Sequence, residues 1–156
     1  MKIDNTDKGK WVALLMGVKF FSNCTEEELA ALLDVGEVRH YKLHDYIIKE
    51  DDGTEDHSFF VILKGSAKVL KKAPMAMKKE VAALPEGECF GEMAFLLNTA
   101  RTAYILAMED CYMFCINAED VGKMNDAIKA KIYHQFAISM ANKLKYLTES
   151  LLRPYY

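Results

Sequence analysis

The spacing of hydrophobic residues divides the 156-residue chain into three blocks. In the first block, residues 1–35, apolar side chains recur at steps of three and four, the period of an amphipathic helix. The set comprises Trp11, Leu14, Leu15, Val18, Phe21, Leu29, Leu32 and Leu33. Thr25 followed by Glu28 has the form of a capping box, which predicts that a second helix starts there. We therefore expect an N-terminal helical segment over residues 1–35.

The second block, residues 36–117, consists of short apolar runs separated by turn signals. Asp52-Gly53, Lys64-Gly65 and Pro85-Glu86-Gly87 are the turn signals. The predicted strands are Val38–Tyr41, Tyr46–Ile48, Phe59–Leu63, Ala67–Leu70, Val81–Leu84, Ala103–Met108 and Tyr112–Ile116. Many short strands at close spacing are typical of a β-roll of the jelly-roll type, a double-stranded β-helix. One short helical run interrupts this block, within residues 89–103.

The third block, residues 118–156, is helical again. Its apolar stripe steps by four, and once by three, through Ile128, Ile132, Phe136, Met140, Leu144, Leu147 and Leu151. Pro154 marks the expected end of the helix. The last steps of the stripe follow a heptad, which predicts a homodimer seam along this helix. The whole chain is expected to form one domain, mainly β with flanking helices.

Composition limits the possible partners and the compartment. The chain is 51% hydrophobic and 28% charged, as in an ordinary globular domain, and its net charge of −3 argues against a nucleic-acid partner. No apolar run approaches the roughly 20 residues of a membrane helix, so no membrane partner is expected. The start of the chain is too polar for a signal peptide. The four cysteines have no CxxC spacing, which favours free thiols and a cytoplasmic protein.

The most informative stretch runs from Cys89 to Ala103. Gly91 can let the backbone approach a ligand closely, and the short helical run after it presents free N–H groups to an anion. Arg101, nine residues after Glu92, supplies a planar fork of donors suited to phosphate, and no acidic residue lies between Glu92 and Glu109. The Glu92 carboxylate can accept from a sugar hydroxyl. These features together predict a nucleotide monophosphate site.

The same stretch resembles the phosphate-binding cassette of the cyclic nucleotide-binding domain family. Phe90-Gly91-Glu92-Met93-Ala94-Phe95-Leu96 and Asn98-Thr99-Ala100-Arg101-Thr102-Ala103 match the family pattern. Ala100 stands where a proline is frequent, and Tyr104 stands where a tryptophan or a hydroxyl residue is common. The order of helices, β-roll and long helix also agrees with the family, from about Phe20 to Leu151.

The resemblance implies a role for each cassette residue. Glu92 would accept a hydrogen bond from the ribose 2′-hydroxyl, and Arg101 would pair with the exocyclic phosphate oxygens. Gly91 would allow close approach, and backbone N–H groups of Met93 and Ala94 would face the phosphate.

The resemblance also implies residues around the base. Thr102 would contact the phosphate or the purine, or it simply opens a strand. Val81 and Ala82 would line the base pocket, although any core strand has such residues. Leu147 and Thr148 match the part of the long helix that caps the base.

Two rival functions stay open at this stage. A cupin-like metal-dependent enzyme shares the β-roll, but His40 and His44 are about 13 Å apart if both lie on one strand, too far to bind one metal ion. No residue is assigned to catalysis or to a metal, because the known catalytic motifs are absent, and Cys89 is interpreted as a structural thiol. The second rival is a degenerate domain that serves only as an interaction surface.

The sequence thus predicts a sensor or regulatory module that binds cAMP or cGMP, is not an enzyme and needs no cofactor. The long helix would act as a lid and as the homodimer seam. The effector protein is unknown. Because the chain ends soon after the long helix, we expect no output domain of its own.

Overall fold

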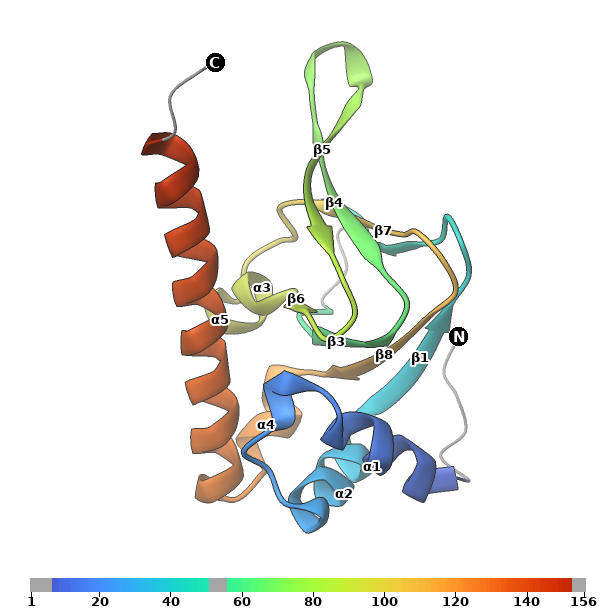
Figure 1. Cartoon of the computed structure of the whole chain (residues 1–156), viewed down its shortest axis with the longest axis vertical. Helices are drawn as coiled ribbons and strands as arrows, with labels where there is room; N and C mark the ends of the chain where they lie inside the picture. Colours follow the sequence, from blue (N-terminus) through green and yellow to red (C-terminus); the bar gives the residue numbers. More distant parts are fainter. Residues whose placement is uncertain (1–6, 51–55, 153–156) are drawn as a thin grey trace.

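The computed structural model describes residues 7–50 and 56–152. The expected turn at Asp52-Gly53 and the stop at Pro154 lie outside these ranges. Within them the chain forms two antiparallel sheets with helices at both ends, as Figure 1 shows. The predicted fold class, mainly β with flanking helices, is confirmed.

The N-terminal helices cover one side of the roll. They are α1 (Lys8–Met16), the 3-10 helix η2 (Lys19–Phe21) and α2 (Glu26–Val35). The capping box is present: the Thr25 hydroxyl accepts from the Glu28 N–H at 3.2 Å, and the Glu28 carboxylate accepts from the Thr25 N–H at 2.9 Å. Both groups that the helix would otherwise leave unpaired are therefore satisfied, which sets the start of α2.

Each sheet contains four strands. The strand order is β1-β8-β3-β6 in one sheet and β2-β7-β4-β5 in the other. The strands are β1 (Glu37–Tyr41), β2 (Tyr46–Ile48), β3 (Phe59–Lys64), β4 (Ala67–Lys72), β5 (Lys78–Leu84), β6 (Cys89–Phe90), β7 (Tyr104–Ala107) and β8 (Cys111–Ile116). Strand β3 is buried on both faces from Phe59 to Leu63, because the interior of the roll lies on one side and the helices on the other.

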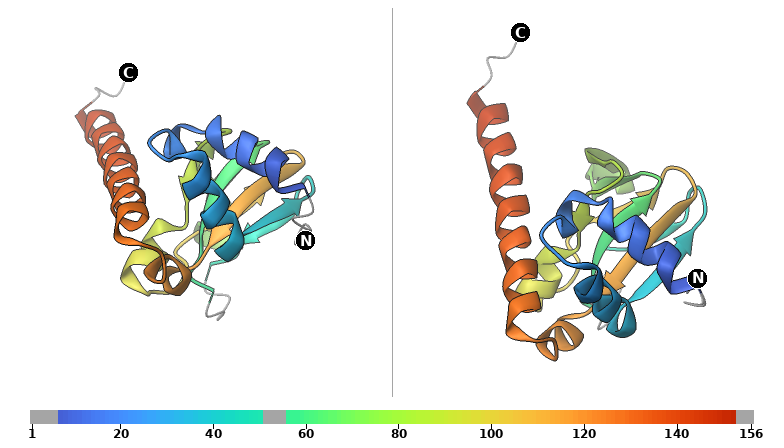
Figure 2. Two further views of the ribbon diagram at one scale, coloured as in Figure 1. Left: turned by 90° about the horizontal axis from the view of Figure 1, so that it is seen from below. Right: turned by 60° about the horizontal axis from the view of Figure 1, so that its bottom comes forward.

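Four helical elements follow β4 in the described residues. A 3-10 turn, η3 (Pro74–Ala76), joins β4 to β5; the short helix α3 (Glu92–Leu97) follows β6; and α4 (Ala118–Gly122) leads to the long helix α5 (Asp126–Leu152). Figure 2 shows α5 running along one side of the molecule, beside α3 and the N-terminal helices. Lys131 of α5 forms an ion pair at 2.5 Å with Glu28 of α2, which fixes the lower part of α5 against the N-terminal layer.

A group of phenylalanines joins the helices to the roll. The ring of Phe59 on β3 lies 4.7 Å from that of Phe136 on α5 and 5.2 Å from that of Phe95 on α3, measured between centroids. Phe20 lies 5.6 Å from Phe136 and completes the contact with η2. All four side chains are buried, so four elements that are distant in sequence share one hydrophobic cluster.

Several sequence-based expectations need correction. The third block is not one helix: the chain breaks after α4, and the Asn125 side chain accepts from the Ile128 N–H at 2.9 Å, which caps a new helix start. His44 lies in a turn with φ of 70° and not on a strand with His40. The two-residue strand β6 was not predicted, and β5 begins three residues earlier than expected because its outer part pairs with β4 while its side chains stay exposed.

The phenylalanine cluster generates the first prediction. Phe136→Ala is expected to lower the free energy of unfolding by about 3–5 kcal/mol, since it removes a buried ring and leaves a cavity among three others. Tyr133→Ala on the same helix is the matched control and should lower it by clearly less, because that side chain is 43% exposed. Denaturant unfolding of both variants tests this, and equal losses would contradict the role given to the cluster.

Candidate functional site

The site is built on the turn that leads from β6 into α3. Gly91 adopts φ of 84°, a left-handed conformation that glycine tolerates and other residues avoid. A Cβ at this position would lie 2.9 Å from the Ser58 carbonyl oxygen and 3.0 Å from Nη1 of Arg101. The glycine is therefore required both for the turn and for the close approach of Arg101.

Arg101 is buried, with 8% of its surface exposed. Its Nη2 donates to the Ser58 carbonyl oxygen at 2.7 Å and its Nη1 donates to the Gly91 carbonyl oxygen at 3.2 Å. The guanidinium also lies 5.9 Å from the centre of the Phe60 ring. The sequence suggested a phosphate as the partner of Arg101, because no acidic residue is near it in the chain. The structure shows two backbone carbonyls at this guanidinium, one just before β3 and one between β6 and α3.

Glu92 is also buried, with 6% of its surface exposed. Its Oε1 accepts from Nζ of Lys143, on α5, at 2.5 Å. The same lysine donates to the Cys89 carbonyl oxygen at 3.0 Å. A buried carboxylate needs such a partner, and the pair connects the first residue of α3 to the long helix.

Asp56 orients Ser58 through a hydrogen bond to its backbone N–H. Its Oδ1 accepts from the Ser58 N–H at 3.0 Å, and its Oδ2 lies 3.5 Å from Arg39. Burial alone would raise the pKa of Asp56, but the hydrogen bonds from Ser58 and the nearby charges of Arg39 and Arg101 outweigh it and hold that pKa below the usual value. Asp56 therefore stays a carboxylate at neutral pH and orients the residue whose carbonyl meets Arg101.

Cys89 is the first residue of the cassette and lies on β6. Burial raises the pKa of its thiol to about 11, and its Sγ lies 3.3 Å from the Ser139 hydroxyl on α5. The thiol is therefore protonated at neutral pH, in agreement with its interpretation as a structural residue.

The other residues expected at the site are more dispersed. Ala94 is buried on α3, whereas Met93 is 54% exposed. Thr102 is exposed, and its carbonyl oxygen accepts from Nζ of Lys71 on β4. Val81 and Ala82 are exposed residues of β5, at the edge of the second sheet.

The residues expected to cap the base point to solvent. Leu147 is 58% exposed, and the Thr148 hydroxyl donates to the Leu144 carbonyl oxygen within α5, at 2.9 Å. The structure thus brings Gly91, Glu92 and Arg101 together, but it does not bring Leu147 and Thr148 to them.

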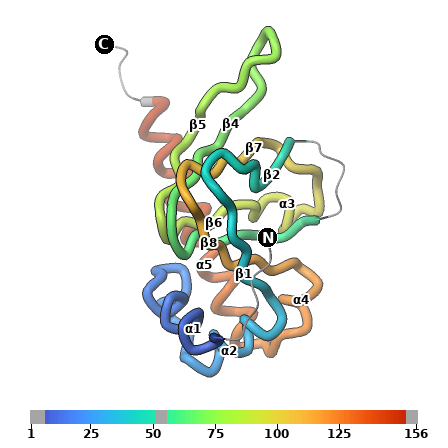
Figure 3. The backbone as a smooth tube through the Cα atoms, turned by 90° about the vertical axis from the view of Figure 1, so that its right-hand side faces the viewer, coloured from blue at the N-terminus to red at the C-terminus, as the bar shows by residue number. Residues whose placement is uncertain are grey.

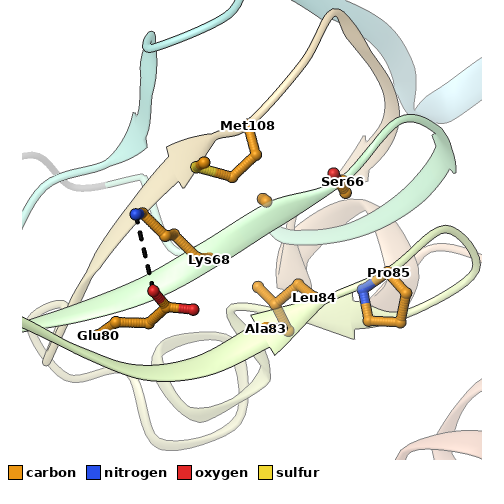
Figure 4. Close-up of a pocket in the computed structure, with 8 residues that line it drawn as sticks. Ser66, Lys68, Glu80, Ala83, Leu84, Pro85 and Met108 are labelled. Atoms are coloured by element: carbon orange, nitrogen blue, oxygen red, sulfur yellow. Dashed lines mark ion pairs between the residues drawn. The ribbon is translucent and has the colours of Figure 1, made fainter.

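A separate hollow of about 240 Å³ lies on the second sheet, away from these residues. It is lined by Ser66, Ala67, Lys68, Glu80, Ala83, Leu84, Pro85 and Met108. An ion pair of 3.7 Å between Lys68 and Glu80 spans it, as Figure 4 shows. None of the cassette residues lines this hollow. Within residues 7–50 and 56–152 there is also no group of three or more His, Cys, Asp or Glu that could hold a metal ion.

Sequence reasoning missed two residues of the site, Ser58 and Lys143. Ser58 contributes a carbonyl oxygen, which any residue type would supply, so no sequence signal marks it. Lys143 lies between Met140 and Leu144 on the polar side of the stripe, and only the packing of α5 decides which lysine reaches Glu92. Both are identified by geometry alone.

Comparison with known proteins decides the family. The family model described as "Cyclic nucleotide-binding domain" matches residues 38–126, which contain the roll and the cassette. The chain belongs to the cyclic nucleotide-binding domain family. The predicted family is therefore confirmed.

Among its relatives, this domain resembles human cGMP-dependent protein kinase 2, with 35% identity over 97 residues, 62% of the chain. It is 37% identical over 99 residues, also 62% of the chain, to isozyme 1 of the Drosophila melanogaster cGMP-dependent protein kinase. The matches span only 12% and 13% of the lengths of these kinases.

Solved structures share the fold. A cyclic nucleotide-binding domain from Methylobacillus flagellatus superposes with a TM-score of 0.81 at 16% identity, over 97% of this chain and 87% of the other. The Thermus thermophilus catabolite activator protein has a TM-score of 0.70 at 23% identity, over 85% of this chain and 61% of that one.

Two glycines with similar backbone geometry allow a matched test of the cassette. Gly91→Ala should lower the free energy of unfolding by more than Gly87→Ala, whose φ is 90° but whose added Cβ would meet nothing within 4 Å. The control experiences only the backbone cost, about 1–2 kcal/mol, whereas the Gly91 variant must also displace Ser58 or Arg101. Denaturant unfolding measures the difference, and equal losses would mean that the contact with Arg101 is not tight.

Proposed function

We propose that this domain binds a cyclic nucleotide at the cassette and reports the bound state to a partner protein. The observation that carries the proposal is Arg101, a buried arginine held between Gly91 and Ser58. A guanidinium presents five donors in one plane, which suits it to hold backbone carbonyls and phosphate oxygens. The exocyclic oxygens of the cyclic phosphate would meet this guanidinium and the first N–H groups of α3, at Met93 and Ala94.

Glu92 would accept a hydrogen bond from the ribose 2′-hydroxyl. Its side chain is buried, directly after the Gly91 turn that contacts Arg101. Lys143 orients it through one oxygen, Oε1. A carboxylate has two oxygens and about four acceptor sites, so it can bind the lysine and a hydroxyl together. In this proposal Lys143 is a positioning residue and does not itself touch the ligand.

The ligand is proposed to be cAMP or cGMP. The kinase relatives are named as cGMP-dependent, whereas a structural neighbour, the regulatory domain of Toxoplasma gondii PKA, is described with cAMP. Thr102, with its hydroxyl next to Arg101, and Val81 and Ala82 on β5 are the proposed contacts of the base. No cofactor is needed for binding alone.

The module would be regulatory and would perform no chemistry on the ligand. The part of α5 beyond Lys143 carries exposed apolar side chains, Leu144, Leu147 and Leu151. We propose that this part closes over the base as a lid, with Leu147 and Thr148 facing it, and that it also offers the homodimer seam. A cytoplasmic location and an effector protein complete the proposal.

Arg101→Ala should weaken cyclic nucleotide binding by at least about 2 kcal/mol, roughly thirtyfold in Kd, because a phosphate would lose a charged hydrogen-bond partner. Arg101→Lys should recover little, since the planar fork is lost. Calorimetric titration of the wild type and both variants with cAMP and with cGMP measures this.

The matched control for this titration is Lys19→Ala, which removes a positive charge from an exposed residue of η2, outside the cassette. It should leave Kd within a few-fold of the wild type. Equal affinity of the wild type and Arg101→Ala would overturn the phosphate assignment. Absence of binding in the wild type would favour a degenerate interaction module, and stoichiometric metal in the purified protein would favour the cupin-like enzyme.

The lid makes a separate prediction. Nucleotide should slow amide exchange in residues 91–102 and in residues 141–151, because a ligand can move α5 only by binding the closed position more tightly. Exchange of the wild type with and without ligand measures this, and the Arg101→Ala variant at the same ligand concentration is the control. Protection limited to residues 91–102 would mean that α5 is not a lid.

A further inference from the structure

The hairpin formed by β4 and β5 extends beyond the roll. Figures 1 and 3 show both strands projecting past the other elements at one end of the molecule. A register shift between Val69 and Leu70 separates an inner part from this outer part. On β5 every residue from Lys78 to Ala83 is exposed and only Leu84 is buried. The outer part therefore contributes little to the core of the roll.

The end of the hairpin is apolar although it lies in solvent. Met75 is 92% exposed and Met77 is 64% exposed, at the turn that follows Pro74. Met75 and Ala76 both adopt positive φ, 67° and 58°, a conformation for which glycine, asparagine and aspartate are better suited. Neither turn chemistry nor core packing explains two methionines here.

Two cross-strand pairs of lysines, here called the lysine rows, lie next to this apolar end. Lys72 pairs with Lys78 across the strands, and Lys71 pairs with Lys79 one step further from the turn. Like charges directly opposite each other destabilise a hairpin, so this arrangement does not serve the stability of the fold.

The charge of these rows is not cancelled by the contacts found for them. Nζ of Lys78 donates to the Tyr46 hydroxyl at 2.8 Å and Nζ of Lys71 donates to the Thr102 carbonyl oxygen, and neither acceptor carries a charge. Residues 67–84 contain five lysines and one acidic residue, Glu80, whereas the whole chain has a net charge of −3, so positive charge is concentrated on this hairpin.

We propose that the hairpin is a docking element for an anionic lipid surface, into which Met75 and Met77 insert while the two rows of lysines contact the headgroups. The order along the hairpin agrees with the depth profile of a bilayer interface, apolar at the end and basic one to two residues behind it. A protein partner would need a larger buried area than a narrow convex turn offers. This differs from the expectation of no membrane partner, which concerned spanning segments; among the described residues no helix is suited to cross a bilayer.

The test is co-sedimentation of the full chain with vesicles, without nucleotide. The wild type should bind vesicles containing about a third phosphatidylserine and should lose that binding in phosphatidylcholine alone and at high salt. Met75→Ser/Met77→Ser should weaken the binding about tenfold or more, because insertion of two apolar side chains is lost. Lys72→Glu/Lys79→Glu should weaken it by at least about twentyfold, since each charge near the surface contributes roughly fivefold.

Two matched controls keep the result specific. Met16→Ser/Leu43→Ser removes two other exposed apolar side chains, 48% and 50% exposed, and Lys19→Glu/Lys42→Glu makes the same change of charge elsewhere. Both should bind as the wild type does. The proposal is overturned if the wild type does not bind anionic vesicles. It is also overturned if the lysine variant weakens vesicle binding and the methionine variant does not, or if each control variant weakens binding as much as its counterpart. Since the assay uses no nucleotide, its outcome is independent of the proposed cyclic nucleotide site.

Discussion

The contact among Phe59, Phe95 and Phe136 is the constraint on which the arrangement of the site depends. Phe59 follows Ser58, whose carbonyl meets Arg101; Phe95 belongs to the cassette helix α3; and Phe136 lies about two turns before Lys143 on α5. Close-packed rings tolerate only discrete arrangements, so a shift of α3 must move α5 or break the cluster. Packing at this point thus couples β3, α3 and α5, beside or on which Ser58, Glu92 and Lys143 lie.

Two polar side chains connect the same parts of the structure as the phenylalanine rings. Arg101 connects the cassette turn to the residue before β3, and Lys143 connects the cassette to α5, so two charged side chains bridge the same three elements as the rings. The Arg101 bridge involves a buried guanidinium and the Lys143 bridge ends on the buried Glu92 carboxylate, and an unpaired charge at such a position is costly. Since a ligand phosphate and a ribose hydroxyl would act on Arg101 and Glu92, binding would change both bridges at the point where the rings fix the helices.

The extent to which the sequence predicted this structure follows from how local each signal is. Seven strands, the capping box at Thr25 and the cassette residues Gly91, Glu92 and Arg101 were recognisable because period, turn residues and spacing are local properties. Strand β6 and the outer part of β5 were not, because backbone pairing holds them while their side chains carry no alternating pattern. Ser58 and Lys143 depend on tertiary packing. The break before α5 is marked by Asn125, whose side chain caps the new helix three residues before the apolar stripe starts at Ile128.

A hydrogen bond between described residues joins the hairpin to the end of the cassette. Lys71, in the basic rows, donates to the carbonyl of Thr102, the residue after Arg101, and β4 pairs with β7 directly beyond it. If a lipid surface attracts Lys71 away from that carbonyl, the end of the cassette loses a support; if a ligand draws Arg101 and Thr102 inward, the same lysine is released. Coupling of this kind is reciprocal by thermodynamic necessity. The lysine rows thus lie on the β2-β7-β4-β5 sheet, and the loop that carries Arg101 and Thr102 leads directly into β7 of the same sheet.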